Sequence, residues 1–143
     1  KGYLSEDDLW IVCNNINRPV FVDTKKRRLF QKDNVYWKIN KKEYDDLIED
    51  HLPNDDHLIV TLGSAGASWN GMIYKPEPVK VFDVCGAGDT FLAALVYKFL
   101  KTNDMKTSIM YANKAAAIAV THPGAYHLTK KDIESIGEKN EGN

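Results

Sequence analysis

The seven residues from Asp83 to Asp89 combine a glycine-rich loop with two carboxylates, a set of groups that could carry out phosphoryl transfer. Gly86 and Gly88 lack a Cβ, so a phosphate can approach the backbone of the loop closely. Asp89 could take the proton from an attacking hydroxyl. The loop alone also fits a simpler role, in which Asp89 caps a helix and the glycines form a tight turn.

The segments on either side of this loop predict its place in the fold. Val79 to Phe82 has the composition of a hydrophobic strand, and Thr90 to Leu100 has apolar residues at helical spacing. We therefore expect the loop between a strand and the N-terminus of a helix. Unpaired backbone N–H groups and the positive end of the helix dipole favour a bound anion at such a position.

Further strands and helices alternate along the chain, as a parallel sheet requires. A first helix is expected to begin at a capping box formed by Ser5 and Asp8. Its apolar positions are Leu9, Ile11, Val12 and Ile16. The remaining predictions are strands at Val20–Val22, Val35–Ile39 and His57–Leu62, helices at Asn40–Ile48 and Met105–Val120, a hairpin turn at Asn70–Gly71, and a last helix capped by Thr129 and Asp132.

In this order of elements, Asp23, Asn40, Gly63 and Asp83 each come at or just after the end of a strand. The carboxyl ends of parallel strands meet at one edge of a sheet, and open α/β sheets bind their ligands at that edge. We therefore expect these residues, which are far apart in the sequence, to line one crevice.

The loop resembles the DxxGAGD signature of the ribokinase family of carbohydrate kinases, also called the PfkB family. Three other segments resemble motifs of this family in the expected order. Asn40 to Glu43 is similar to the NxxE motif, whose carboxylate helps to organise magnesium and the phosphates. Val60 to Ala67 is similar to the strand and turn that approach the nucleotide. Ala112 to Ala117 is similar to the helix whose Asn lies near the adenine.

The resemblance implies an α/β fold, the ribokinase-like three-layer α/β/α sandwich with a mostly parallel sheet. Residues 1–143 would be its C-terminal portion, a single partial domain that forms the nucleotide-binding half, because nothing here resembles the family's N-terminal sugar-binding segments and lid. The implied reaction is transfer of the γ-phosphoryl group of ATP to a hydroxyl of a sugar or sugar phosphate. We expect this chain by itself to be inactive, because positioning supplies much of the catalysis.

The resemblance also implies roles for particular residues. Asp89 would be the catalytic base, and the backbone N–H groups of Gly86, Ala87 and Gly88 would stabilise charge on the transferring group. Glu43 would hold Mg²⁺, partly through water. The implied nucleotide-binding residues are Lys25, Asn40, Gly63, Ser64, Gly66, Asp83 and Asn113.

Two further segments suggest the acceptor. Asp23 to Lys25 resembles a DPK segment of heptose kinases in this family, although Thr24 replaces the usual proline. Thr121 to Ala125 is similar to a small-residue turn that follows the adenine helix in the heptose 7-phosphate kinase branch. The ribokinase, fructokinase and adenosine kinase branches share the phosphate loop, so they stay open as alternatives.

Several of these residues also have purely structural interpretations. Asn40 and Glu43 form a good capping box, and Asn113 could face solvent from the middle of a helix. Lys25 belongs to a basic run that fits a solvated turn. A second hypothesis for the chain as a whole is a nucleotide-binding remnant that has lost catalysis and serves as an interaction or regulatory module.

Composition argues against several partners. The chain has 143 residues, 43% of them hydrophobic, and a net charge of -1, which offers no field to attract nucleic acid. Its two cysteines indicate a reducing compartment, and no apolar run is long enough to cross a membrane, so we expect a cytoplasmic protein. The strand Val20–Val22 would border the absent half of the sheet. Because exposed strand edges pair with other chains, we also expect a homo-oligomer.

Overall fold

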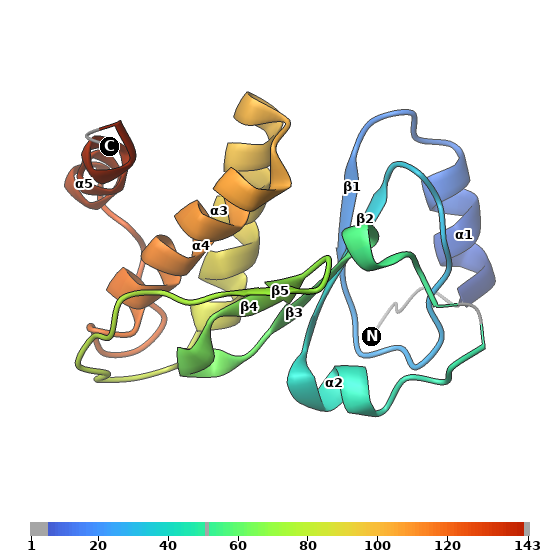
Figure 1. Cartoon of the computed structure of the whole chain (residues 1–143), viewed down its shortest axis with the longest axis horizontal. Coiled ribbons are helices and arrows are strands. Elements are labelled where there is room, and N and C mark those ends of the chain that lie inside the picture. The colour runs from blue at the N-terminus through green and yellow to red at the C-terminus, as the bar shows by residue number, and fades with distance from the viewer. Residues whose placement is uncertain (1–5, 51, 142–143) are drawn as a thin grey trace. The chain divides into compact units, whose positions relative to one another are not determined.

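The computed structural model describes residues 6–50 and 52–141 (Figure 1). The chain divides into two compact units. The first contains Lys1–Leu62 and Ser68–Ile73, and the second contains Gly63–Ala67 and Tyr74–Asn143. The predicted site residues are therefore divided between the units, with the NxxE-like motif in the first and the glycine loop in the second.

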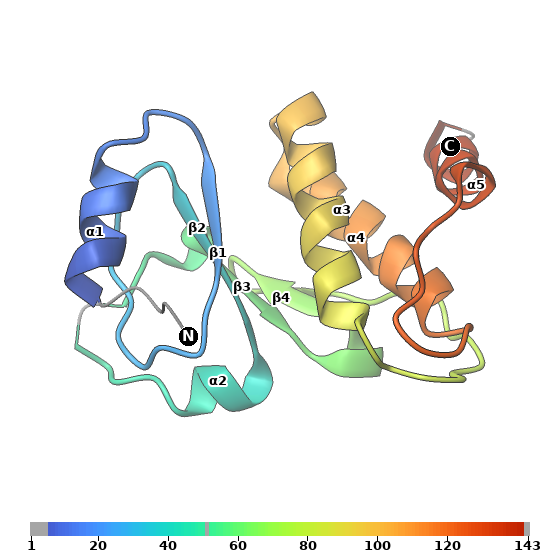
Figure 2. The ribbon, with the colours of Figure 1, turned by 180° about the vertical axis from the view of Figure 1, so that it is seen from behind.

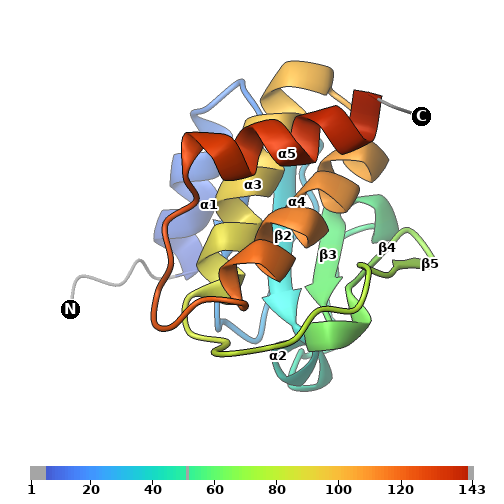
Figure 3. The same ribbon diagram turned by 90° about the vertical axis from the view of Figure 1, so that its left-hand side faces the viewer.

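The described strands form a single sheet of five, in the order β1-β2-β3-β4-β5. They are β1 (Val20–Asp23), β2 (Val35–Asn40), β3 (Leu58–Thr61), β4 (Ala67–Trp69) and β5 (Met72–Tyr74). β1 is parallel to β2, and β2 is parallel to β3; Figure 3 shows β2 and β3 running in the same direction. These three strands match the predicted ones to within one residue at each end.

The core of the first unit lies between α1 (Glu6–Asn14) and the parallel strands. Leu9 and Cys13 are four residues apart, so they lie on the same side of the helix. They cluster with alternate residues of the strands, because successive side chains of a strand point to opposite faces. The buried members of this cluster are Leu9, Cys13, Leu29, Val35, Trp37, Ile39, Leu58 and Val60.

Of the four apolar positions expected for the first helix, one is buried. Leu9 is buried, but Ile11, Val12 and Ile16 are exposed. The helix ends at Asn14, before Ile16, and Cys13 takes the buried position one turn after Leu9. The predicted cap at Ser5 lies outside the described residues.

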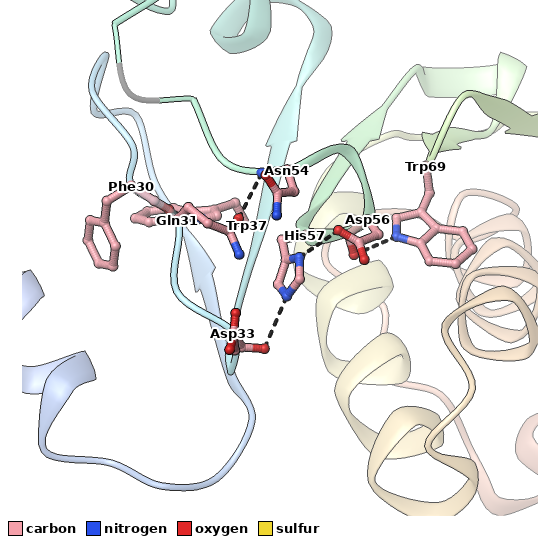
Figure 4. A network of polar contacts seen from close by, with 8 residues as sticks. All are labelled: Phe30, Gln31, Asp33, Trp37, Asn54, Asp56, His57 and Trp69. Carbon is pink, nitrogen blue, oxygen red and sulfur yellow. Dashed lines mark hydrogen bonds and ion pairs between the residues drawn. The ribbon is translucent and has the colours of Figure 1, made fainter.

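A polar network joins two loops of the first unit (Figure 4). One ring nitrogen of His57 lies 2.7 Å from the Asp56 carboxylate, and the other lies 3.0 Å from the Asp33 carbonyl oxygen. Trp69 donates its indole N–H to the Asp56 carbonyl at 2.9 Å, which ties β4 to the same loop.

The hairpin between β4 and β5 turns at the predicted residues. Asn70 and Gly71 have φ values of 50° and 80°. Positive φ at both central residues is the geometry of a type I′ turn, which suits the twist of the two strands. The predicted hairpin is therefore confirmed.

The second unit contains three α-helices within its described part. α3 (Ala87–Thr102) packs along α4 (Met105–Ala119), and Figures 1 and 2 show these two helices side by side. α5 (Lys130–Glu141) packs against α4. Its N-terminus has the predicted reciprocal cap, in which Asp132 N–H donates to Thr129 Oγ1 and Thr129 N–H donates to the Asp132 carboxylate.

The strand predicted at Val79–Phe82 is absent, and this prediction was wrong. The apolar side chains that suggested it are exposed, including 69% of Phe82. At the end of this segment, the Val120 carbonyl accepts the N–H groups of Phe82 and Asp83 at 2.7 and 3.1 Å. A strand needs a neighbour along its length, and the described residues provide none here.

Candidate functional site

The glycine loop leads into α3. This helix begins at Ala87, three residues before the predicted start at Thr90. Gly86 is the N-cap residue and has φ of 74°, a left-handed conformation that favours glycine. A Cβ at this position would lie 3.2 Å from the Cβ of Ala125. Gly86 is therefore needed both for the turn and for close packing against the loop that follows α4.

Asp83 joins the two loops at this end of the second unit. One carboxylate oxygen accepts the N–H of Cys85 at 2.9 Å, and the other accepts the N–H of Gly124 at 3.0 Å. These two backbone hydrogen bonds, the one from Cys85 first, hold the pKa of Asp83 below its ordinary value. The ionised Asp83 side chain thus connects the start of α3 to the segment after α4, and we call this contact the Asp83 clamp.

The N-terminus of α3 leaves several backbone donors available. The Ala87 N–H donates to the Val84 carbonyl at 3.1 Å, so this one of the predicted anion-binding groups is already used. The N–H groups of Gly86, Gly88 and Asp89 have no acceptor within the described part of the chain. Three donors at a helix N-terminus are suited to an anion.

Asp89 lies in the first turn of α3 with an exposed side chain. Its carboxylate has no hydrogen-bond or ion-pair partner among residues 6–50 and 52–141. It lines a cavity of about 440 Å³ together with Thr90, Tyr97, Tyr111 and His127. The carboxylate is therefore accessible to a small molecule in a cavity of the size that ligand sites have.

The turn after β3 contains three predicted nucleotide-binding residues, Gly63, Ser64 and Gly66. Gly63 and Ser64 are exposed in the short 3-10 helix Gly63–Ala65, and a Cβ on Gly63 would meet nothing within 4 Å. Gly66 is buried with φ of 99°, and a Cβ there would lie 2.0 Å from the Tyr74 carbonyl oxygen. Gly66 thus has a packing requirement that sequence reasoning did not identify.

Asn113 is buried in the middle of α4, with 6% of its surface exposed, so the solvent-facing alternative was wrong. Its side-chain amide donates to the Tyr74 carbonyl oxygen at 2.9 Å. Gly66 and Asn113 therefore meet at the same carbonyl group. This contact brings two predicted nucleotide-binding residues together, although they are far apart in the sequence.

In the first unit, Asn40 and Glu43 form the predicted capping box at the start of α2 (Lys41–Asp45). The Asn40 side chain accepts the Glu43 N–H at 2.8 Å, and the Glu43 carboxylate accepts the Asn40 N–H at 2.9 Å. α2 is a single short turn that ends well before Ile48, the predicted end. Only one Glu43 oxygen is used, so the other is available to a ligand.

Lys25 is exposed in the turn after β1, where the Lys26 N–H donates to Thr24 Oγ1. Sequence reasoning missed a different lysine. Lys38 is buried in β2 and forms an ion pair with Asp23 at 3.2 Å. The two residues are directly opposite each other in the parallel pair β1 and β2, a relationship that becomes visible only once the strand register is known.

Asp23 and Asn40 are the last residues of β1 and β2, as predicted, and Gly63 follows two residues after the end of β3 at Thr61. Asp83 does not follow a strand, so its predicted place at a strand end was wrong. Residues 6–50 and 52–141 contain no group of three or more His, Cys, Asp or Glu side chains that could hold a metal ion. Within the same residues, no helix is both long and apolar enough to cross a membrane.

The fold is that of ribokinase-like kinases. The chain superposes on ribokinase from Thermotoga maritima with a TM-score of 0.69 and 19% identity, covering 92% of this chain and 53% of that one. It also matches aminoimidazole riboside kinase from Salmonella enterica, solved with aminoimidazole riboside and an ATP analogue. That match has a TM-score of 0.60 and 25% identity and covers 71% of this chain and 41% of the other.

Residues 35–132 match the model of the pfkB family carbohydrate kinases, and the chain belongs to that family. It is 33% identical to the bifunctional protein HldE of a Nitratiruptor species, over 94% of this chain and 33% of that protein. The chain thus spans about a third of the length of this curated relative.

Proposed function

We propose that this chain forms the nucleotide-binding part of a kinase that transfers the γ-phosphoryl group of ATP to a hydroxyl of a sugar or sugar phosphate. The observation that carries the proposal is the Asp89 carboxylate, which is exposed, unpartnered within the described residues and located beside unused N–H groups. A base for the attacking hydroxyl and an anion-stabilising helix terminus are the main requirements for this transfer.

In the proposed reaction, Asp89 accepts the proton of the acceptor hydroxyl as the oxygen attacks the γ-phosphorus. The backbone N–H groups of Gly86 and Gly88 stabilise the charge that spreads over the transferring phosphoryl group. Ala87 is the first residue of the helix, and its own N–H already donates to the Val84 carbonyl. Asp83 keeps the loop in place through its hydrogen bonds to Cys85 and Gly124.

Asn113, Lys25 and the turn from Gly63 through Ser64 to Gly66 are proposed to contact the nucleotide. Mg²⁺ would be held beside Glu43, whose second oxygen is not used by the capping box. A single available carboxylate fits this ion, which keeps several waters and binds mainly through the phosphates of the nucleotide. When bound, the ion would supply charge neutralisation at the β- and γ-phosphates.

The proposed acceptor is heptose 7-phosphate. Its support is the Asp23 to Lys25 segment, together with similarity to HldE over nearly the whole of this chain. We further propose that the 143-residue chain alone does not phosphorylate the acceptor, because the acceptor must be held in line for transfer.

The test is ADP formation by the protein that carries these residues, with a panel of sugars and sugar phosphates. Asp89→Asn should lower kcat by at least about 100-fold, the contribution of a positioned base, with ATP affinity nearly unchanged. Glu134→Gln, which removes an exposed carboxylate from α5, serves as the matched control. Retention of most activity by Asp89→Asn would remove this residue from the base role, and ATP binding without turnover of any acceptor would favour the nucleotide-binding remnant.

A further inference from the structure

Lys38 is a charged residue in a buried position, with 6% of its surface exposed. It alternates along β2 with Trp37 and Ile39, which belong to the hydrophobic cluster, so its side chain points to the opposite face of the sheet. A buried ammonium group loses its hydration and therefore needs partners that replace the lost water.

The Lys38 ammonium group has fewer hydrogen-bond acceptors than it has hydrogens to donate. An ammonium group has three donors, and Nζ of Lys38 makes one hydrogen bond, to Asp23 Oδ2 at 3.2 Å. The other two have no acceptor within the described part of the chain. The Asp23 side chain is itself 33% exposed, so this carboxylate is the solvent-accessible member of the pair. Apolar residues would be at least as stable in place of such a pair, so stability alone does not account for it.

The position of Lys38 indicates what its unused donors could bind. Asn40 follows two residues later and therefore points to the same face of β2, and Thr61 of β3 lies opposite Asn40. Lys38 thus belongs to the carboxyl edge of the parallel strands, which is the edge at which open α/β sheets bind ligands.

We propose that Lys38 binds a phosphate group of the ligand and that Asp23 is the counter-ion that this phosphate replaces. The exchange keeps the lysine paired throughout, while the Asp23 carboxylate turns toward the solvent to which it is already partly exposed. A phosphate has several acceptor oxygens and can engage the two donors that a single Asp23 oxygen leaves unused. The inference rests on the proposed function for the nature of the ligand, which is either the nucleotide or a phosphorylated acceptor.

The test is isothermal titration calorimetry of the 143-residue chain with inorganic pyrophosphate as the probe. Asp23→Asn removes the competing carboxylate, so pyrophosphate should bind more tightly, by about tenfold if one charged contact is released. Lys38→Met should weaken binding by a similar factor, whereas Lys38→Arg should retain most of it. Asp45→Asn is the matched control, because it removes the same charge from the exposed Lys41–Asp45 pair of the same unit. It should leave binding unchanged.

The opposite signs for Asp23 and Lys38 separate ligand binding from a structural role, since loss of a structural ion pair would weaken binding in both variants or in neither. Thermal melts followed by circular dichroism show whether each variant is folded. Equal pyrophosphate binding by folded wild-type and Asp23→Asn chains, or no binding by either, overturns the proposal. Titrations with ADP and with a hexose 6-phosphate then show which source is preferred. These results are independent of the turnover assay with Asp89→Asn, so the two proposals can fail separately.

Discussion

The carboxylate of Asp83 accepts the backbone N–H of Gly124 at 3.0 Å, across 41 positions of the sequence. The same carboxylate accepts the N–H of Cys85, so a single side chain connects the glycine loop to the segment after α4. The glycine loop of this unit is therefore held by a tertiary contact as well as by its own turn.

Removal of this clamp should loosen both loops. In Asp83→Ala, the N–H groups of Cys85 and Gly124 lose their acceptor, so their amide hydrogens should exchange faster with solvent. Amides in the middle of α4 should be much less affected. Hydrogen exchange followed by NMR measures this directly. Unchanged protection at Gly124 would show that Asp83 does not hold the loop in solution.

The two glycines of the turn after β3 should respond differently to alanine. Gly63→Ala should cost about 1–2 kcal/mol for its positive φ alone, since its surroundings are open. Gly66→Ala should cost about 1–3 kcal/mol more, because the new Cβ would collide with the Tyr74 carbonyl oxygen. Chemical denaturation gives both values. Equal losses would contradict the close approach of Gly66 to Tyr74.

Asn113→Ala should destabilise the second unit by about 1–3 kcal/mol, because the Tyr74 carbonyl loses a buried hydrogen-bond donor. Lys106→Ala, at an exposed position of the same helix, should change stability by less than about 0.5 kcal/mol. Urea denaturation of the two variants tests this. A loss no larger than that of the control would mean that the amide does not bind Tyr74.

Acid should weaken the second unit through two carboxylates. Backbone hydrogen bonds lower the pKa of Asp83, and the Thr129 N–H, followed by the Tyr126 hydroxyl, lowers the pKa of Asp132. A lowered pKa in the folded state stabilises the fold above the unfolded value of about 3.9, and this stability is lost as the pH falls through the folded-state value. Melting temperature should therefore fall as the pH is lowered from about 5 into the range below 4. The double variant Asp83→Asn with Asp132→Asn should show a smaller fall, and an identical pH profile would rule out both groups.

β1 is the outermost strand of the sheet that the described residues form. We expect the chain to self-associate as its concentration rises, because such edges tend to pair. Light scattering over a dilution series measures the average mass. A monomer of 16.2 kDa at every concentration would show that this edge does not recruit a second chain.

Features that depend on neighbouring residues could be predicted from the sequence. The Asn70–Gly71 turn, the Asn40–Glu43 capping box and the cap of α5 at Thr129 each involve groups within three positions of one another. Their geometry follows from the local chain and persists wherever the rest of the molecule lies. The parallel strands were also predictable, because their apolar residues must be buried.

Features that depend on distant partners were decided by the tertiary structure. Val79–Phe82 has a strand-like composition but no neighbouring strand among the described residues, so it stays irregular. The ion pair of Lys38 with Asp23 needed the register of β1 and β2, and Gly66 needed the carbonyl of Tyr74 beside it. Residue type alone determined which chemistry this chain can offer. The partners that hold those residues in place were determined by packing, because a hydrogen bond or a steric contact depends on distances that only the folded chain sets.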